Sequence, residues 1–385
     1  MTKQQLAAIS ICLFLIGSAE VVAGPMMHFM GPHFGVASSA IAYLPAAYGL
    51  TYGFVALMAG PLSDRFGRKR PLQIGLLGFA LLCALLPSSP NLSVAIGMSA
   101  LSGLCAAIIQ PNALALVADA STPDQVGRRL GHVFAGLMLA FVFTPMLAGR
   151  LADTVGWAWA YYALAVLALV ICFAVTRGFA SRPALVGQSV GFLATHRAAL
   201  RTRGVALRLV ASYLWLGWVA GFGAVVAEVG ARKLSLSSTE AGLLAGFFGL
   251  VVILGNLVSG ACQRMAGEFA LPVAAMASAV GLTAFAMPST SITQLALLGL
   301  PWAFGYGCAG PLHHARLSNL STRCRGTINS YHASLLNLGI FSVAFLLGAI
   351  APEGPLDRFC ALVGITAFVG AALLLPWSSR KVRTI

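Results

Sequence analysis

The feature that most constrains this chain is a series of long apolar runs separated by short polar loops. A helix that crosses the hydrocarbon core of a bilayer needs about 20 mostly apolar residues. Twelve runs of this kind can be traced, and they predict an all-α membrane protein with twelve transmembrane helices. Their approximate bounds are Leu6 to Met27, Ala40 to Gly60, Leu72 to Leu86, Leu92 to Val117, Leu130 to Leu151, Trp157 to Val175, Leu207 to Val226, Ala241 to Cys262, Leu271 to Pro288, Ile292 to Leu312, Ile328 to Ala349 and Phe359 to Trp377.

The charge composition fits a chain embedded in lipid. Only 9% of the residues are charged, whereas about a quarter are charged in an average soluble domain. The formal net charge of +14 does not indicate nucleic-acid binding, because the basic residues lie between apolar runs and form no stripe with interleaved aromatics. The first run is long, contains Glu20 and lacks a cleavage site, so we interpret it as a retained span and not a signal peptide.

The distribution of basic residues predicts the orientation in the membrane. Short loops rich in Lys and Arg stay on the cytoplasmic side. With twelve spans, most of the 24 basic residues fall on one side, and those on the other side are Arg150, Arg232, Lys233 and Arg358. We therefore expect both termini in the cytoplasm and a multi-pass protein of the plasma membrane, which in a bacterium is the inner membrane.

A basic polar stretch divides the spans six and six. We predict a cytoplasmic linker at residues 177–206, between an N-terminal six-helix bundle (1–176) and a C-terminal six-helix bundle (207–385). The halves also resemble each other, because Gly60 and Gly67 of the first half coincide with glycines 200 positions later. Parallel repeats are typical of transporters. We therefore predict two pseudo-symmetric bundles around a central cavity.

The loop between spans two and three carries the most specific motif, Gly-Pro-Leu-Ser-Asp-Arg-Phe-Gly-Arg-Lys-Arg over residues 60–70. Its glycines permit close helix contacts and a tight turn, and adjacent acidic and basic residues can form charge-assisted contacts. The pattern resembles the loop motif G-x-L-x-D-R-x-G-R-K of the major facilitator superfamily. The resemblance implies a transporter that opens alternately to each side, and its gating residues here would be Gly60, Asp64, Arg65, Gly67 and Arg68.

Residues 17–25 of the first span, Gly-Ser-Ala-Glu-Val-Val-Ala-Gly-Pro, resemble the proton-antiport exporters of drugs, sugars and nucleosides in that superfamily. Those exporters place an acidic residue there. Two positions depart from their pattern: Ser99 precedes Gly103 where they carry Arg, and the span-five pattern G-P-x-x-G-G is reduced to Thr-Pro-Met-Leu-Ala-Gly over residues 144–149. Proton symport and facilitated uptake therefore stay open beside efflux.

Glu20 is the acidic residue that lies clearly inside a predicted span. An ionised carboxylate in the bilayer costs several kcal/mol, about 3 by insertion scales, so Glu20 should face a cavity or be protonated. Ionisable residues within a membrane are functional by default, and we predict that Glu20 carries the coupling proton. The alternative is a structural carboxyl satisfied by a neighbouring helix. The equivalent position of the second half is Ala220.

Aromatic and amide side chains near the middle of several spans predict a mixed pocket for an organic, partly apolar solute. Several of the aromatics share one helix face, although contact with lipid or packing between helices is an open alternative for each. The candidate cavity residues are Tyr48, Tyr52, Gln110, Asn112, Trp215, Trp218, Phe222, Asn256, Trp302, Tyr306 and Asn337.

Cysteine and histidine give weaker signals. The eight Cys have no paired metal-ligand spacing and are expected to be small buried hydrophobes. His28 and His33 lie beside three Met residues, a cluster that a soft metal would accept, but apolar packing is the favoured interpretation, and no metal site or cofactor is predicted. For His313, His314 and His332, helix capping is favoured over proton relay.

These observations predict a secondary active transporter and not an enzyme. The sequence has no nucleotide-binding loop, hydrolase triad or metalloprotease motif. We expect proton-coupled efflux of a small organic molecule by a monomer whose partners are the substrate, protons and the bilayer, with no nucleic acid. The alternatives are uptake by proton symport or facilitated diffusion, and a membrane receptor or sensor on a transporter scaffold.

Overall fold

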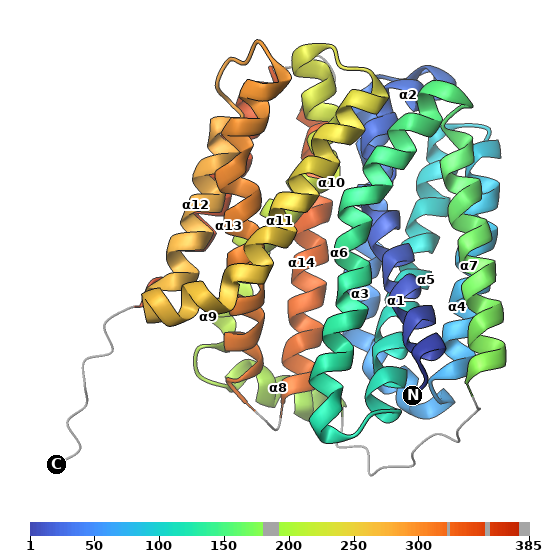
Figure 1. Ribbon diagram of the computed structural model, residues 1–385, viewed down its shortest axis with the longest axis vertical. Helices are drawn as coiled ribbons and strands as arrows, with labels where there is room; N and C mark the ends of the chain where they lie inside the picture. The colour runs from blue at the N-terminus through green and yellow to red at the C-terminus, as the bar shows by residue number, and fades with distance from the viewer. Residues whose placement is uncertain (180–191, 322–323, 351–354, 377–385) are drawn as a thin grey trace.

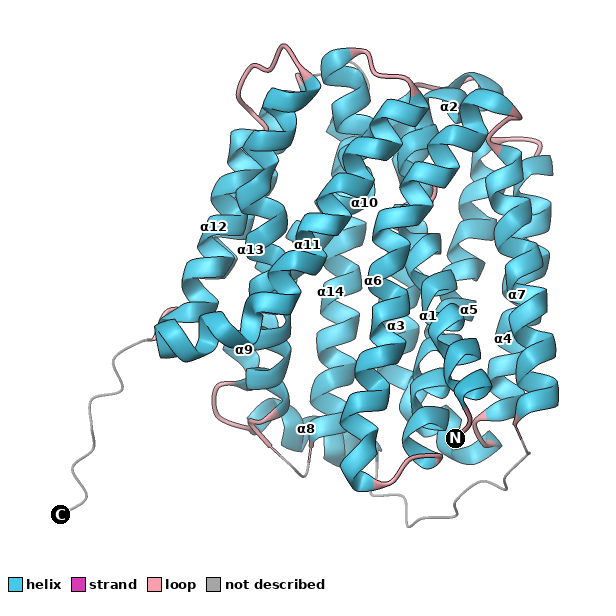
Figure 2. Ribbon diagram, in the orientation of Figure 1, coloured by secondary structure: helices cyan, strands magenta, loops and turns pink. Residues whose placement is uncertain are grey.

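The structure is a computed structural model that describes residues 1–179, 192–321, 324–350 and 355–376. The side chains of residues 59–66, 123–124 and 192–193 lie outside this description. Every regular element in the described ranges is a helix, and most of the helices run side by side along the long axis (Figure 1, Figure 2). The predicted all-α class is confirmed.

The first half of the chain contributes six spanning runs. The first run breaks after α1, where a 3-10 turn begins at Gly24 and contains Pro25, and a short helix completes the run. The elements are α1 (Lys3–Val21), η1 (Gly24–Met26), α2 (Met27–Phe34), η2 (Ser38–Ala42), α3 (Tyr43–Phe66), α4 (Lys69–Leu85), η3 (Leu86–Ser88), α5 (Leu92–Asp119), α6 (Pro123–Thr154) and α7 (Ala158–Gly178).

The second half follows a short helix, α8 (Phe192–Arg201), and contributes six further runs. Its first run is continuous but contains a π-helical turn, η4, between two α-helical parts. The elements are α9 (Val205–Ala211), η4 (Ser212–Gly217), α10 (Trp218–Leu234), α11 (Ser238–Ala266), η5 (Gly267–Phe269), α12 (Ala270–Ala284), α13 (Ile292–Ser318), α14 (Arg325–Ile350) and α15 (Leu356–Ala372).

Ten stretches of the described residues are long and apolar enough to cross a membrane. One of them, residues 238–284, consists of the two antiparallel helices α11 and α12 joined by η5 (Figure 1). The apolar helix α15, with 17 residues, is one more. The described part of the chain therefore contains twelve spanning runs, as predicted.

Local sequence explains where several helices begin. The hydroxyl of Ser237 accepts a hydrogen bond from the Glu240 N–H, and the Glu240 carboxylate accepts one from the Ser237 N–H. This reciprocal pair satisfies two backbone donors that the first turn of α11 leaves without partners. Asn91 and Ser291 cap the first turns of α5 and α13 more simply, because the side chain of each accepts one backbone N–H bond.

The two halves meet through close helix pairs, in which α6 packs against α11 and α3 against α14. Small residues let these helices approach. A Cβ added at Gly242 of α11 would overlap the carbonyl oxygen of Pro145 on α6, and at Gly49 of α3 it would lie 2.9 Å from the carbonyl oxygen of Asn337 on α14. Larger side chains at these positions would push the two six-helix bundles apart.

One end of the molecule is closed by hydrogen bonds between the halves. This end, which we call the α2 end, holds α2, η2 and the C-terminal part of α10, and it lies opposite the N-terminus (Figure 1). Ser38 of η2 donates to Oε1 of Glu228 on α10, at 2.5 Å. Thr239 of α11 donates to Oδ2 of Asp153 on α6 through its N–H, at 2.7 Å, and through its hydroxyl.

The seventh span extends further than predicted. We expected it to end at Val226, but α10 continues to Leu234, because apolar and small residues follow Glu228 and the basic pair Arg232 and Lys233 occupies the last turn. The division of the chain at residues 177–206 stays a prediction, and residues 180–191 of that linker lie outside the described part.

Candidate functional site

A cavity with about 1020 Å³ of empty space, open solvent included, lies between the two halves. Its walls come from α1, α3, α5 and α6 of the first half and from α10, α11, α13 and α14 of the second. Most of its lining is aliphatic or aromatic. The residues that line it are Glu20, Val21, Tyr52, Gln110, Leu137, Met138, Phe141, Pro145, Val219, Ala220, Gly223, Ala224, Val226, Ala245, Phe248, Gly249, Val252, Trp302, Tyr306, Ala333, Leu336, Asn337 and Ile340.

Polar groups from both halves reach this cavity. The hydroxyl of Tyr52 on α3 donates to Oε1 of Gln110 on α5. On the opposite side, the amide of Asn337 donates to the carbonyl oxygen of Ala333 one turn earlier, at 3.0 Å, while its Oδ1 is buried and has no hydrogen-bond partner among the described residues. Oδ1 of Asn337 is thus a buried acceptor whose hydrogen-bonding capacity is not used by the described residues.

Glu20 is the acidic residue in the cavity wall, near the end of α1. Its carboxylate makes no hydrogen bond or ion pair with any residue that the structure describes. The hydroxyls of Tyr52 and Tyr306, which also line the cavity, lie within electrostatic range of it. A carboxyl group placed this way can exchange a proton with water in the cavity or pair with a cationic group of a solute.

Three predicted aromatics pack inside the second half and do not line this cavity. Trp215 is fully buried, and its indole N–H donates to Oγ of Ser278 at 2.8 Å. Phe222 is also fully buried and packs edge-to-face on Trp302, with ring centroids 5.2 Å apart. Trp218 is buried nearby. Of the three, Phe222 supports Trp302 from behind the cavity wall.

The remaining predicted residues lie elsewhere as well. Tyr48 lines a smaller cavity of about 380 Å³ inside the first half, together with Ser99. Asn112 is buried on α5 and donates to the carbonyl oxygen of Ile108, at 2.8 Å. Asn256 is half-buried on α11, away from the lining of the central cavity.

The predicted gating loop joins α3 to α4. Gly67 ends α3 with a φ of 74°, a conformation that favours glycine. Arg68 forms an ion pair with Asp119 at the end of α5, with Nε and Oδ2 3.5 Å apart, so the loop is attached to a second helix of the first half. The side chains of Gly60, Asp64 and Arg65 lie outside the described residues.

The histidines form no metal centre. Among the described residues, no group of three or more His, Cys, Asp or Glu side chains is placed to hold a metal ion. His33 instead packs edge-to-face on Trp157, with ring centroids 5.2 Å apart. His313 and His332 both contact the hydroxyl of Ser212, at 2.8 and 2.9 Å, beside the π-helical turn.

Comparison with known proteins identifies the family. The sequence model of the Major Facilitator Superfamily matches residues 9–344. The chain belongs to this superfamily. It is therefore a multi-pass secondary transporter of a small molecule and not an enzyme.

Relatives in the superfamily are distant but match along most of the chain. The chain is 24% identical over 371 residues to "Uncharacterized MFS-type transporter YceJ" of Bacillus subtilis, covering 93% of this chain and 91% of that protein. It is 26% identical over 397 aligned positions to "Multidrug resistance protein MdtG" of Salmonella paratyphi A, covering 100% and 97%.

Solved structures of the superfamily share the fold. The "D-xylose-proton symporter" has a TM-score of 0.79 at 14% identity, with 97% of each chain covered. A mutant form of the "nucleoside transporter NupG" has a TM-score of 0.78 at 12% identity, covering 96% of this chain and 98% of that one. The predicted arrangement of two six-helix bundles around a central cavity is confirmed.

One buried acidic residue of this transporter was missed by the sequence analysis. Glu228 is 1% exposed on α10 and accepts the bond from Ser38 across the two halves. It was missed because the predicted span ended at Val226. The residues Val229, Gly230 and Ala231 that follow Glu228 are the signal that would have extended the span and included it.

Proposed function

We propose that this transporter exports a small, partly apolar organic molecule in exchange for protons, with Glu20 as the proton carrier. The observation that carries the proposal is the position of Glu20. It is the acidic residue of the cavity between the halves, and no hydrogen bond or ion pair holds it among the described residues.

The cavity supports a substrate of this class. Its lining is mainly aliphatic and aromatic, with a few polar groups that can fix the orientation of a solute. The multidrug resistance protein MdtG aligns with the whole chain, which favours efflux over uptake. Rings such as Phe141, Phe248 and Trp302 would contact the apolar part of the solute.

Proton movement and solute movement would then be coupled because the proton and the solute compete for one carboxyl group. A protonated Glu20 is neutral and compatible with an apolar wall, whereas an ionised Glu20 is costly unless a cationic or hydrogen-bonding solute pairs with it. Alternating access exposes the same group first to one aqueous phase and then to the other. One proton carried inward on Glu20 is thereby exchanged for one solute carried outward. The loop with Gly60, Asp64, Arg65, Gly67 and Arg68 would act as the gate on the opposite side from the α2 end.

Uptake by proton symport or facilitated diffusion is the second candidate. It is favoured by Ser99, which occupies the position where similar exporters carry an Arg and whose hydroxyl donates to the carbonyl oxygen of Leu44, at 2.7 Å. Without that Arg, Glu20 has no evident cationic partner among the described residues of the first half. A receptor that binds its ligand without transporting it is the third candidate.

A vesicle assay tests these possibilities. Purified protein is placed in proteoliposomes that contain a pH-sensitive dye, and a panel of lipophilic cations, neutral drugs, sugars and nucleosides is added. We expect at least one compound to move protons in the opposite direction with the native protein, and none to do so with Glu20→Gln. Glu240→Gln is the matched control, because it makes the same chemical change at an exposed capping residue.

Three outcomes would count against the proposal. Proton movement in the same direction as the compound indicates symport. Equal fluxes with the native protein and Glu20→Gln mean that Glu20 does not carry the proton. Stoichiometric binding of a compound with no flux indicates a receptor.

A further inference from the structure

Glu228 lies at the interface between the halves, in the part of α10 that reaches the α2 end. Its side chain is 1% exposed. Where α10 approaches η1 of the other half, a Cβ added at Gly24 would lie 2.9 Å from the carbonyl oxygen of Ala224. The backbone of α10 one turn before Glu228 is therefore in close contact with the first half.

The hydrogen bond from Ser38 belongs to the closed conformation. Ser38 lies in the first half and Glu228 in the second, with 2.5 Å between Oγ and Oε1. If the halves part at the α2 end, this bond breaks and the carboxyl group meets the aqueous phase on that side. A second hydrogen bond, from Thr239 to Asp153, joins the halves at the same end, but it lies at the surface and Asp153 is exposed in the closed conformation.

The charges around Glu228 do not neutralise it. No cation among the described residues lies within ion-pair distance of its carboxylate. Arg232, one turn further along α10, and His28 on α2 act on it electrostatically from further away. Lys233 is directed elsewhere, because its ammonium group donates to Oδ1 of Asp357 at 2.7 Å and to the carbonyl oxygen of Met287 at 3.2 Å.

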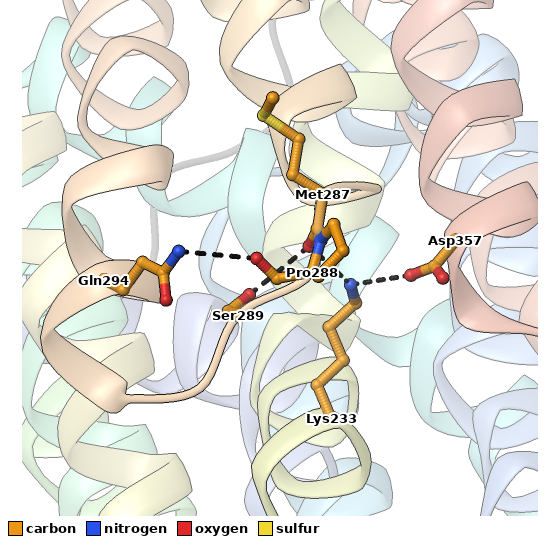
Figure 3. Close-up of polar contacts among 6 residues, drawn as sticks. All are labelled: Lys233, Met287, Pro288, Ser289, Gln294 and Asp357. Carbon is orange, nitrogen blue, oxygen red and sulfur yellow. Dashed lines mark hydrogen bonds and ion pairs between the residues drawn. The ribbon is translucent and has the colours of Figure 1, made fainter.

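Figure 3 shows where Lys233 is held. Its side chain extends between Asp357 on α15 and the turn after α12, and Gln294 and Ser289 complete the hydrogen bonds of that turn. The C-terminal part of α10 is thus anchored in its own half by Lys233. Glu228, a little more than one turn earlier, is bonded to the other half.

We propose that Glu228 is a second proton-binding site, which is loaded from the aqueous phase at the α2 end and links closure of that end to protonation. In the open conformation the carboxylate is hydrated and ionised. Closing the end buries it without a counter-ion in contact, which disfavours the charged form. One proton taken up from solution on a carboxylate oxygen removes this cost, while Oε1 still accepts the bond from Ser38.

The inference rests on the proposed function only because it requires the halves to part at the α2 end, and it does not require Glu20 to carry a proton. Thermodynamic linkage between protonation and closure sets the size of the expected pH effect. If closure takes up one proton, the ratio of open to closed conformations changes by up to about tenfold per pH unit, with alkaline pH favouring the open one.

Backbone hydrogen–deuterium exchange of the full-length protein in lipid nanodiscs tests this directly, with exchange times scaled for the intrinsic effect of pH. The informative peptides cover residues 24–42 and 224–240. In the native protein their exchange should rise from pH 6 to pH 8. In Glu228→Gln, which keeps an acceptor for Ser38 and cannot ionise, exchange should stay at the low level at both pH values.

Two variants keep the inference falsifiable if Glu228→Gln fails to fold. Ser38→Ala weakens the closed conformation and leaves the carboxylate, so the pH at which the end closes should move to lower values. Asp153→Ala removes the exposed contact to Thr239 and should raise exchange while the pH dependence stays. A pH dependence that survives in Glu228→Gln, or a closing pH that does not move in Ser38→Ala, would overturn the proposal.

Glu20→Gln separates the two proposals. If Glu20 carries the coupling proton and Glu228 controls the α2 end, this variant loses proton-coupled flux in proteoliposomes and keeps the pH-dependent exchange. Loss of both together would show that the exchange reports on Glu20, and the assignment to Glu228 would be wrong.

Discussion

A single methyl group at Gly242 should shift the transporter toward the conformation that is open at the α2 end. In Gly242→Ala the new Cβ would overlap the carbonyl oxygen of Pro145 and lie 3.0 Å from its carbonyl carbon and 3.4 Å from the Cα of Met146. Carbon atoms in contact need about 3.5 to 4.0 Å. The atoms in the way belong to the backbone of α6, so no side chain can rotate to make room. Because the nearest of them would have to move out to a normal van der Waals contact, α6 and α11 must separate by about 1 Å.

The expected cost falls on the closed conformation alone. Overpacking by one methyl group costs about 1 to 3 kcal/mol, which corresponds to about a 5- to 150-fold change in the equilibrium between closed and open conformations. Opening of the α2 end should move the first turns of α11 away from α6 and relieve this overlap. The variant should therefore fold, while its turnover falls because return to the closed conformation becomes unfavourable.

Gly131→Ala is the matched control on α6. A Cβ at Gly131 meets no atom within 4 Å, and alanine in place of glycine stabilises a helix by about 0.5 to 1 kcal/mol. Exchange of backbone amides in residues 138–150 and 239–252 should rise in Gly242→Ala and stay at the native level in Gly131→Ala. If Gly242→Ala exchanges and transports like the native protein, the interface between α6 and α11 is not closed as tightly as its contacts imply, and the reasoning fails.

Two further substitutions test a residue of the cavity lining and a residue of the aromatic cluster behind it. Tyr52→Phe removes the hydrogen bond to Gln110, which is worth about 0.5 to 1.5 kcal/mol. The KM of a hydrogen-bonding substrate should change by about 2- to 10-fold while proton coupling persists, and a loss of coupling at unchanged KM would contradict a role in substrate contact. Phe222→Ala removes a fully buried ring that packs on Trp302 and Phe285. Because this costs about 3 to 5 kcal/mol, the melting temperature in detergent should fall clearly. An unchanged melting temperature would mean that this aromatic cluster is not a packed core.

The number and order of the spans could be predicted from the sequence because each span is a local property. A run of about 20 apolar residues is stable across a bilayer whatever its neighbours are. The end of a span is less predictable when a charge falls near it. At Glu228 the expected span stopped because a carboxylate is costly in lipid, yet α10 continues to Leu234, since that face of the helix meets η1 and η2 and not lipid.

Which residues face the cavity could not be predicted in the same way. A helix that is apolar all round gives no signal for the side that faces its neighbours. Trp215 and Trp218 on the seventh run are the same residue type as Trp302 and were expected at a similar depth in the membrane. The π-helical turn at residues 212–217, however, changes the direction in which side chains point between α9 and α10. Their rings lie in the second bundle, whereas Trp302 on α13 lines the cavity. The direction of each side chain depends on such tertiary details.

The two halves share one fold but differ in the chemistry they carry. The residue that corresponds to Glu20 in the second half is Ala220, and both line the central cavity. The residue that corresponds to Glu228 in the first half is His28, which is exposed at the α2 end and acts electrostatically on Glu228. In each pair, one half therefore carries a carboxylate and the equivalent position of the other half carries a residue that is not a carboxylate. If Glu20 and Glu228 bind protons as we propose, each protonation would alter one bundle and not its counterpart. It would then change the contacts between the halves, and this asymmetry would let a proton drive the movement of one bundle against the other.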